Sequence, residues 1–98
     1  MTKVAILGFG TVGSGVAEVL SKNSQGIARR SGGEIQVKYI LDVRDFPDSP
    51  FKDCFVKDFS IIENDPEVEV VVETIGGAKV ALEFTTRALK AGKSVVSS

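Results

Sequence analysis

The sequence has 98 residues, of which 43% are hydrophobic and 26% are charged, so we expect one soluble globular domain or one piece of a larger one. Twelve basic residues against thirteen acidic ones give a net charge of −1, which argues against a nucleic-acid-binding module with its usual basic excess. The sequence contains no histidine, which excludes Ser-His-Asp and Cys-His catalysis and removes the commonest metal ligand. We therefore expect no metal site.

The single cysteine, Cys54, allows no intrachain disulfide and no paired-cysteine metal or redox site. We expect it to be a small core side chain, because no histidine is present to activate it. The first apolar run, residues 4–7, is too short for a signal peptide or a membrane span. We therefore expect a cytoplasmic protein that binds neither membranes nor nucleic acid.

The chain opens with an unbroken apolar run at residues 3–7, which is typical of a strand covered on both faces of a parallel sheet. A glycine-rich turn and a helix follow, and the helix is expected to end between residues 20 and 27. Residues 29–33 contain two glycines and polar neighbours, which predict a connecting loop. One face of the helix is predicted to carry its apolar side chains, namely Val12, Val16, Val19 and Leu20.

A second strand is predicted from Ile35 to about Leu41, where apolar and polar residues alternate. Two prolines predict an irregular loop over residues 46–53, and a brief third strand is expected at residues 54–56. Asp58 is predicted to cap a short helix, because its carboxylate can accept hydrogen bonds from free backbone N–H groups.

The core of a fourth strand is predicted at residues 70–72, and a second long helix from about residue 78 to 91. A fifth strand begins at Ser94. Alternation of strands and helices predicts an α/β fold, a doubly wound parallel sheet with strand order 3-2-1-4-5 that is incomplete. The apolar face of the second helix is predicted to consist of Ala81, Phe84, Ala88 and Ala91.

The turn after the first strand reads Gly8-Phe9-Gly10-Thr11-Val12-Gly13. Its position, directly after a buried strand and at the start of a helix, matches the fingerprint of a Rossmann-like dinucleotide-binding domain. Gly8 would permit the tight turn, Gly10 would leave room for a pyrophosphate, and Gly13 would let the helix pack closely. Free N–H groups and the positive end of the helix would then face the phosphates. The alternative interpretation is a tight turn without a ligand.

Doubly wound sheets bind ligands beyond the carboxyl ends of their strands. Asp42 follows the second strand and is predicted either to hold a ribose 2′-hydroxyl or to be a solvated strand end. Arg44 and Lys57 follow the second and third strands, and together they would suit a 2′-phosphate. Their alternative interpretation is two isolated surface charges. Two cations against one carboxylate favour NADP as the cofactor, with NAD usable.

The fourth strand ends in Thr74-Ile75-Gly76-Gly77, which is predicted to lie near the nicotinamide half of the cofactor. The glycines would allow close approach of a cofactor ribose, or they would simply form a tight turn into the helix. Ser97 and Ser98 occupy the corresponding end of the fifth strand.

Three segments resemble homoserine dehydrogenases: VAILGFGTVGSGV at residues 4–16, VVVETIGG at residues 70–77, and ALKAGKSVVSS at residues 88–98. The resemblance spans nearly the whole chain and is more specific than the glycine pattern alone. It implies an enzyme that interconverts aspartate 4-semialdehyde and homoserine with NADH or NADPH. That enzyme serves the biosynthesis of threonine, methionine and isoleucine, and we expect it to be a homo-oligomer.

In that family the last strand continues into an Asn-Lys pair and a separate catalytic and dimerisation region, none of which is among residues 1–98. We therefore expect a dinucleotide-binding fragment that has no catalytic residue and no dehydrogenase activity alone. The resemblance implies three groups of cofactor contacts. These are Phe9, Thr11, Val12 and Gly13 at the pyrophosphate, Arg44 and Lys57 at the adenosine phosphate, and Thr74, Ser97 and Ser98 on the nicotinamide side.

Two other functions stay open from the residues. One is a Rossmann-like regulatory module that senses NAD(H) and reduces nothing, and the other is a different semialdehyde or dipicolinate-type reductase. The glycine pattern does not separate these classes, whereas residues 73–77 and the ending favour the dehydrogenase.

Overall fold

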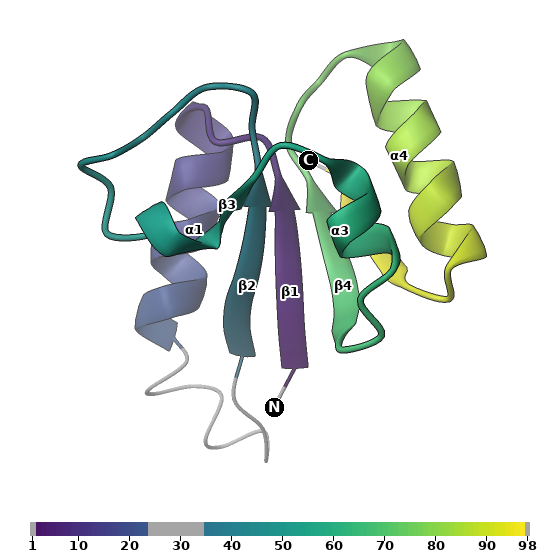
Figure 1. Ribbon diagram of the computed structural model, residues 1–98, viewed down its shortest axis with the longest axis horizontal. Coiled ribbons are helices and arrows are strands. Elements are labelled where there is room, and N and C mark those ends of the chain that lie inside the picture. The colour runs from purple at the N-terminus through teal and green to yellow at the C-terminus, as the bar shows by residue number, and fades with distance from the viewer. Residues whose placement is uncertain (1, 24–34, 98) are drawn as a thin grey trace.

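Five parallel strands form one sheet in the order β3-β2-β1-β4-β5 (Figure 1). The computed structural model describes residues 2–23 and 35–97. The α/β class and the strand order expected from the sequence are confirmed. The strands are β1 (Thr2–Leu7), β2 (Ile35–Leu41), β3 (Phe55–Val56), β4 (Val68–Glu73) and β5 (Ser94–Ser97).

Helices cover both faces of the sheet (Figure 1). On one face α1 (Thr11–Asn23) packs Ala17 against Ile6 and Ile40. On the other face α3 (Phe59–Glu63) and α4 (Ala78–Lys90) pack on a second apolar cluster, which contains Ala5 and Leu7 of β1. A short 3₁₀ turn, η1 (Lys52–Cys54), precedes β3. None of the helices in the described ranges has the length and apolarity needed to cross a membrane.

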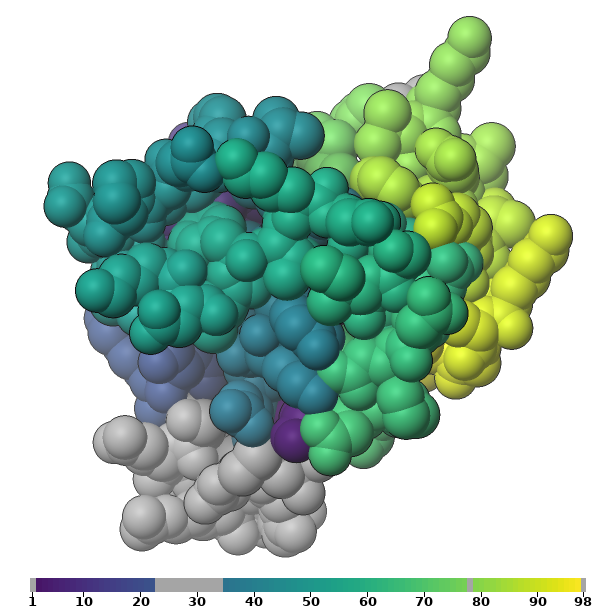
Figure 2. Space-filling view, in the orientation of Figure 1, coloured from purple at the N-terminus to yellow at the C-terminus, as the bar shows by residue number. Residues whose placement is uncertain are grey.

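The central strand β1 is buried on both faces, as its unbroken apolar run predicts. Ala5, Ile6 and Leu7 are completely inaccessible to solvent. Figure 2 shows almost none of the purple N-terminal segment, because the segments around β3 and α3 cover this face of the sheet. The turn at the carboxyl end of β1 therefore leaves from the central strand of the sheet.

The two long helices bury part of the apolar stripes predicted for them. In α1 Gly13 and Ala17 are buried and the predicted Val16 packs against the same cluster, whereas Val12 and Val19 are 51% and 55% exposed. The prediction was wrong for Val12 and Val19, because the helix approaches the sheet most closely through Gly13 and Ala17 and leaves these two valines at its flanks. In α4 the predicted Ala88 is buried and Phe84 packs against the second cluster, while Ala91 lies beyond the helix end and is exposed.

Other local expectations fare differently. Asp58 caps α3 as predicted, since its carboxylate accepts from the backbone N–H of Ser60 at 2.9 Å. The third strand is one residue shorter than expected, because Cys54 belongs to η1. Cys54 is half-buried, and burial raises the pKa of its thiol. The loop expected at residues 29–33 lies outside the described residues.

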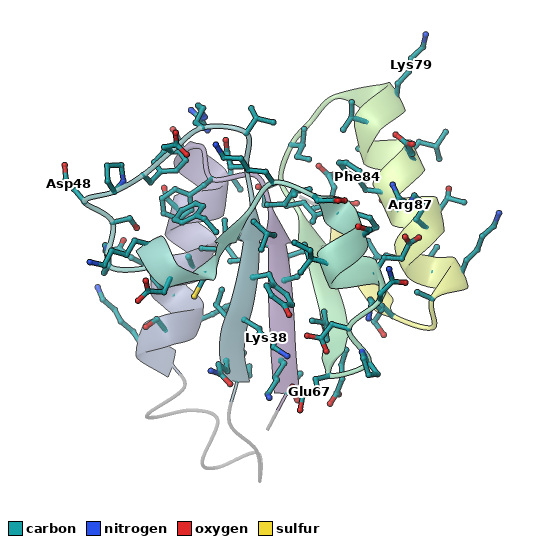
Figure 3. All side chains as sticks on the ribbon, viewed as in Figure 1. Lys38, Asp48, Glu67, Lys79, Phe84 and Arg87 are labelled. Atoms are coloured by element: carbon teal, nitrogen blue, oxygen red, sulfur yellow. The ribbon has the colours of Figure 1, made fainter. Side chains whose placement is uncertain are left out.

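A charged network ties the amino-terminal end of the sheet to the turn before β4. The Lys38 ammonium donates to Asp65 at 2.5 Å and to Glu67 at 2.7 Å, and the Tyr39 hydroxyl donates to Asp65 at 2.6 Å. Figure 3 shows Lys38 and Glu67 together at this end, with Asp48 pointing away on a distant loop. Chiefly through the Lys38 hydrogen bond, the pKa of Asp65 lies well below its ordinary value.

This network predicts a loss of stability in acid. The pKa of Asp65 is lower in the folded state, so its contribution is complete above the unfolded value of roughly 4 and is lost as the pH falls toward the folded value. The urea midpoint of Asp65→Asn should therefore lie below that of the wild type at pH 7 and converge with it at low pH. Asp48→Asn, on the exposed loop, serves as the control and should follow the wild type throughout. A constant difference between Asp65→Asn and the wild type would contradict the assignment.

Candidate functional site

A hollow of about 380 Å³ lies beyond the carboxyl ends of the central strands. The turn after β1 forms its floor, and the segments after β2, β3 and β4 form its sides. We call it the strand-end hollow. The predicted site residues that line it are Gly8, Phe9, Gly10, Asp42, Arg44, Lys57, Thr74 and Ile75.

The remaining predicted site residues lie outside this lining. Thr11 and Val12 begin α1 and are exposed, whereas Gly13 is buried under them. Gly76 lies in the turn before α4, with a φ of 82°. Ser97 is exposed at the end of β5, where it pairs with Glu73 of β4, and Ser98 lies outside the described residues. Cofactor contacts by these residues remain predictions.

The glycine turn has the geometry that the sequence predicts. Gly8 has a φ of 95°, which favours glycine, and its N–H donates to Leu41 O at 2.7 Å. A Cβ placed on Gly13 would lie 2.0 Å from Gly8 O, so α1 approaches β1 too closely for any side chain there. A Cβ on Gly10 would meet nothing within 4 Å. The backbone at Gly10 is therefore open to a ligand.

Thr74 joins the ends of β1 and β4. Its hydroxyl donates to Leu7 O at 2.7 Å, and its backbone N–H donates to the same oxygen at 3.0 Å. A Cβ on Gly8 would lie 3.1 Å from this hydroxyl oxygen. Thr74 thus fixes the position of the turn that follows β4 relative to the glycine turn.

Asp42 is a buried anchor, and its interpretation as a solvated strand end is wrong: its side chain is only 7% exposed. One carboxylate oxygen accepts from Phe9 N and Arg44 Nη2, both at 2.9 Å. The other accepts from Arg44 N at 2.9 Å and Arg44 Nε at 3.0 Å. Four hydrogen bonds occupy the usual acceptor positions of a carboxylate. A ribose hydroxyl can therefore bind Asp42 only after Arg44 moves.

These contacts also change the electrostatics of the site. Hydrogen bonds from Arg44 lower the pKa of Asp42 to about 2, against the opposing effect of burial. Lys57 pairs with Asp45 at 2.8 Å, and both side chains are exposed. The predicted balance of two cations against one carboxylate was wrong, because Asp45 supplies a second carboxylate. Neither Arg44 nor Lys57 is an isolated surface charge.

Sequence reasoning missed an aromatic cluster beside the hollow. Phe46 stacks on Phe55 with ring centroids 5.0 Å apart, and Phe9 packs edge-on against both at 5.0 and 4.9 Å. The Arg44 guanidinium lies over the Phe46 ring at 5.1 Å. The cluster holds the loop after β2 against the glycine turn. No periodic signal marks it, because its members come from a turn, a loop and a short strand.

The far side of the hollow is apolar and comes from α4. Val80 and Phe84 supply it, and Val43, after β2, is a further apolar residue in the lining. Phe84 also stacks on Phe59 of α3 with ring centroids 4.6 Å apart, on the side of α4 that faces α3 (Figure 3). The sequence places Phe84 on the apolar face of its helix, but nothing in it indicates that the ring also reaches the hollow.

A parallel sheet of this order, with a glycine turn entering α1 and a hollow at the strand ends, defines a Rossmann-type dinucleotide-binding domain. Residues 8–98 match the family model described as homoserine dehydrogenase, NAD binding domain. The chain belongs to this family, and the resemblance drawn from the sequence is confirmed. A nicotinamide dinucleotide is accordingly the class of cofactor.

Similar proteins agree with this assignment. The chain is 42% identical over 98 residues to homoserine dehydrogenase of Pseudomonas aeruginosa, a match that covers 98% of this chain and 22% of the relative. For the enzyme of Corynebacterium glutamicum the identity is 38%, covering 97% of this chain and 22% of the relative. A crystal structure of Staphylococcus aureus homoserine dehydrogenase superposes with a TM-score of 0.89 at 31% identity, covering 99% of this chain and 26% of that one. The chain thus spans less than a third of these relatives.

Proposed function

We propose that residues 1–98 are the nicotinamide-dinucleotide-binding portion of a homoserine dehydrogenase. In this proposal the enzyme interconverts aspartate 4-semialdehyde and homoserine by hydride transfer, as a cytoplasmic homo-oligomer. Its catalytic and dimerisation residues come from outside this segment, and the segment alone is inactive. The observation that carries the proposal is the strand-end hollow, where a glycine turn and three further strand ends meet.

The pyrophosphate is assigned to the start of α1. The first N–H groups of a helix lack intrahelical partners, and they carry the positive end of its dipole. In α1 these groups belong to Thr11, Val12 and Gly13, since the first intrahelical acceptor, Gly10 O, receives Ser14 N at 2.9 Å. Gly10 offers no side chain that would keep a phosphate away.

The two halves of the cofactor are assigned to opposite sides of the glycine turn. The adenosine half lies beside Asp42, Arg44 and Lys57, and the nicotinamide half lies beside the turn 74–77 with Ser97 and Ser98. When bound, the dinucleotide supplies or accepts the hydride. The residues of this chain bind and orient it and exclude water from one side of the nicotinamide ring.

We further propose that the preferred cofactor is NADP, with NAD usable. Arg44 and Lys57 are 59% and 61% exposed, so a ligand can reach both side chains. Exposed ion pairs contribute little free energy, whereas a guanidinium and a phosphate form a strong bidentate contact. Lys57 can therefore exchange its exposed Asp45 contact for a 2′-phosphate at little cost, and Arg44 would exchange its bidentate contact with Asp42 for one with the phosphate.

Gly10→Ala tests the pyrophosphate assignment. The added methyl group meets no protein atom, so folding should be unchanged, but it would stand where the pyrophosphate must approach. We expect NADPH affinity to fall roughly tenfold or more, about 1.4 kcal/mol, in a calorimetric titration. Gly15→Ala is the matched control, since Gly15 also has nothing within 4 Å but lies further along α1. Wild-type affinity in Gly10→Ala would refute the proposal.

A further inference from the structure

The end of β4 holds a buried carboxylate that the proposed cofactor contacts do not use. Glu73 is 4% exposed. Within residues 2–23 and 35–97 it forms no ion pair with a basic side chain. Burying a carboxylate without a cation is costly unless hydrogen bonds to its charged form compensate. Hydrogen bonds from backbone N–H groups therefore have to stabilise the buried carboxylate of Glu73.

Those contacts come from the turn that follows the strand. A single oxygen, Glu73 Oε2, accepts from Ile75 N at 2.5 Å and from Gly76 N at 3.0 Å. Successive backbone N–H groups of this kind form an anion-binding concavity. Here it lies just before α4, where negative charge is favoured by the helix dipole, and the N-cap Gly77 has no side chain to supply a cap. The carboxylate of Glu73 thus fills a site that would otherwise attract an anion.

The hydrogen bonds to Glu73 determine which backbone groups of the turn are available to a ligand. A peptide unit is planar, with its C=O opposite its N–H. Since the N–H groups of Ile75 and Gly76 point at Glu73, the carbonyl oxygens of Thr74 and Ile75 point away from it. Thr74 and Ile75 line the strand-end hollow, and Thr74 is pinned to β1 through Leu7 O. The turn is therefore held by Glu73 on one side and by β1 on the other, and the N–H groups of Ile75 and Gly76 are occupied by Glu73.

We propose that Glu73 is a positioning residue for the nicotinamide half of the dinucleotide. It holds the turn 74–77 so that carbonyl oxygens, rather than N–H groups, are available to the carboxamide and ribose hydroxyls, which are hydrogen-bond donors. It also keeps the N–H groups of Ile75 and Gly76 from competing with α1 for the pyrophosphate. The inference rests on the proposed function, because it presupposes that the dinucleotide occupies the strand-end hollow.

The test compares two ligands that share everything except nicotinamide and its ribose. NADH should weaken from wild type through Glu73→Gln to Glu73→Leu, with the leucine variant about tenfold weaker, which corresponds to loss of about 1.4 kcal/mol. The affinity for ADP, which lacks the nicotinamide riboside, should change less than about twofold, a few tenths of a kcal/mol. Glu69→Gln, on an exposed position of the same strand, is the control and should leave both affinities unchanged.

The outcomes separate this inference from the proposed function. Equal weakening of NADH and ADP would show that Glu73 only stabilises the fold, and unchanged NADH affinity in both variants would also overturn the inference. If Glu73→Leu does not fold, the isosteric glutamine variant decides, and the backbone amide resonances of Ile75 and Gly76 should shift in its NMR spectrum. A wild-type chain that binds neither ligand would refute the proposed function, and the inference would fall with it.

Discussion

Alanine in place of Gly13 should disrupt this domain, whereas alanine in place of Gly15, two residues further along the same helix, should stabilise it. A Cβ on Gly13 would lie 2.0 Å from Gly8 O, 2.8 Å from Gly8 C and 2.9 Å from the Thr74 hydroxyl oxygen. Two of these three atoms are backbone and cannot rotate away. The helix α1 would have to move off the sheet, at the point where β1 is most deeply buried.

The expected magnitudes have opposite signs. Overpacking a core costs about 1–3 kcal/mol when side chains can adjust, and with rigid backbone in the way we expect the upper end of that range or more. Gly15 has nothing within 4 Å of its added methyl and lies inside α1, where alanine is favoured over glycine by about 1 kcal/mol. Thermal and urea unfolding, monitored by circular dichroism, measure the change in stability of both variants. A wild-type melting temperature for Gly13→Ala would mean that α1 and the glycine turn are not in contact.

The fold was predictable from the sequence because its main determinants are local. An unbroken apolar run identifies a strand buried on both faces, and a glycine turn after it identifies the start of a tightly packed helix. Periodicity failed at Val12 and Val19 for a physical reason. It reports which residues of a helix are apolar, but not how closely the helix approaches the sheet. In α1 that distance is set by Gly13 and Ala17, and Val12 and Val19 are left at the flanks.

The candidate site was predictable only in its location. Parallel strands place their carboxyl ends together, so the sequence identifies Asp42, Arg44 and Lys57 as neighbours. It does not show which charges pair, because pairing depends on where two loops meet. The bidentate contact between Asp42 and Arg44 and the contact between Lys57 and Asp45 are such loop-dependent features. The role of Glu73 was equally hidden, since its partners are backbone groups of the next turn.

Replacing Arg44 by alanine should weaken NADPH binding far more than NADH binding. A charge-assisted hydrogen bond contributes about 1.5–3 kcal/mol, so loss of the guanidinium should reduce NADPH affinity roughly ten- to a hundredfold. For NADH the same substitution opens one acceptor position on each oxygen of Asp42, because the Nε and Nη2 contacts are lost while those from Phe9 N and the backbone N–H of residue 44 remain. Two open acceptors suit the two hydroxyls of an unphosphorylated ribose, so NADH affinity should be retained or rise.

Parallel titrations of the two cofactors measure this preference, in the isolated chain or in an enzyme that contains it. Arg87→Ala is the matched control, since Arg87 also pairs with a carboxylate, Glu63 at 2.8 Å, but does so between α3 and α4, outside the lining of the hollow. It should leave the ratio of the two affinities unchanged.

Lys57→Ala should lower NADPH affinity less than Arg44→Ala, because a lysine offers a single charge without bidentate geometry. Equal losses of NADPH and NADH in Arg44→Ala would show that the guanidinium never meets the 2′-phosphate. The preference would then revert to NAD, with Asp42 holding the ribose once Arg44 has moved aside.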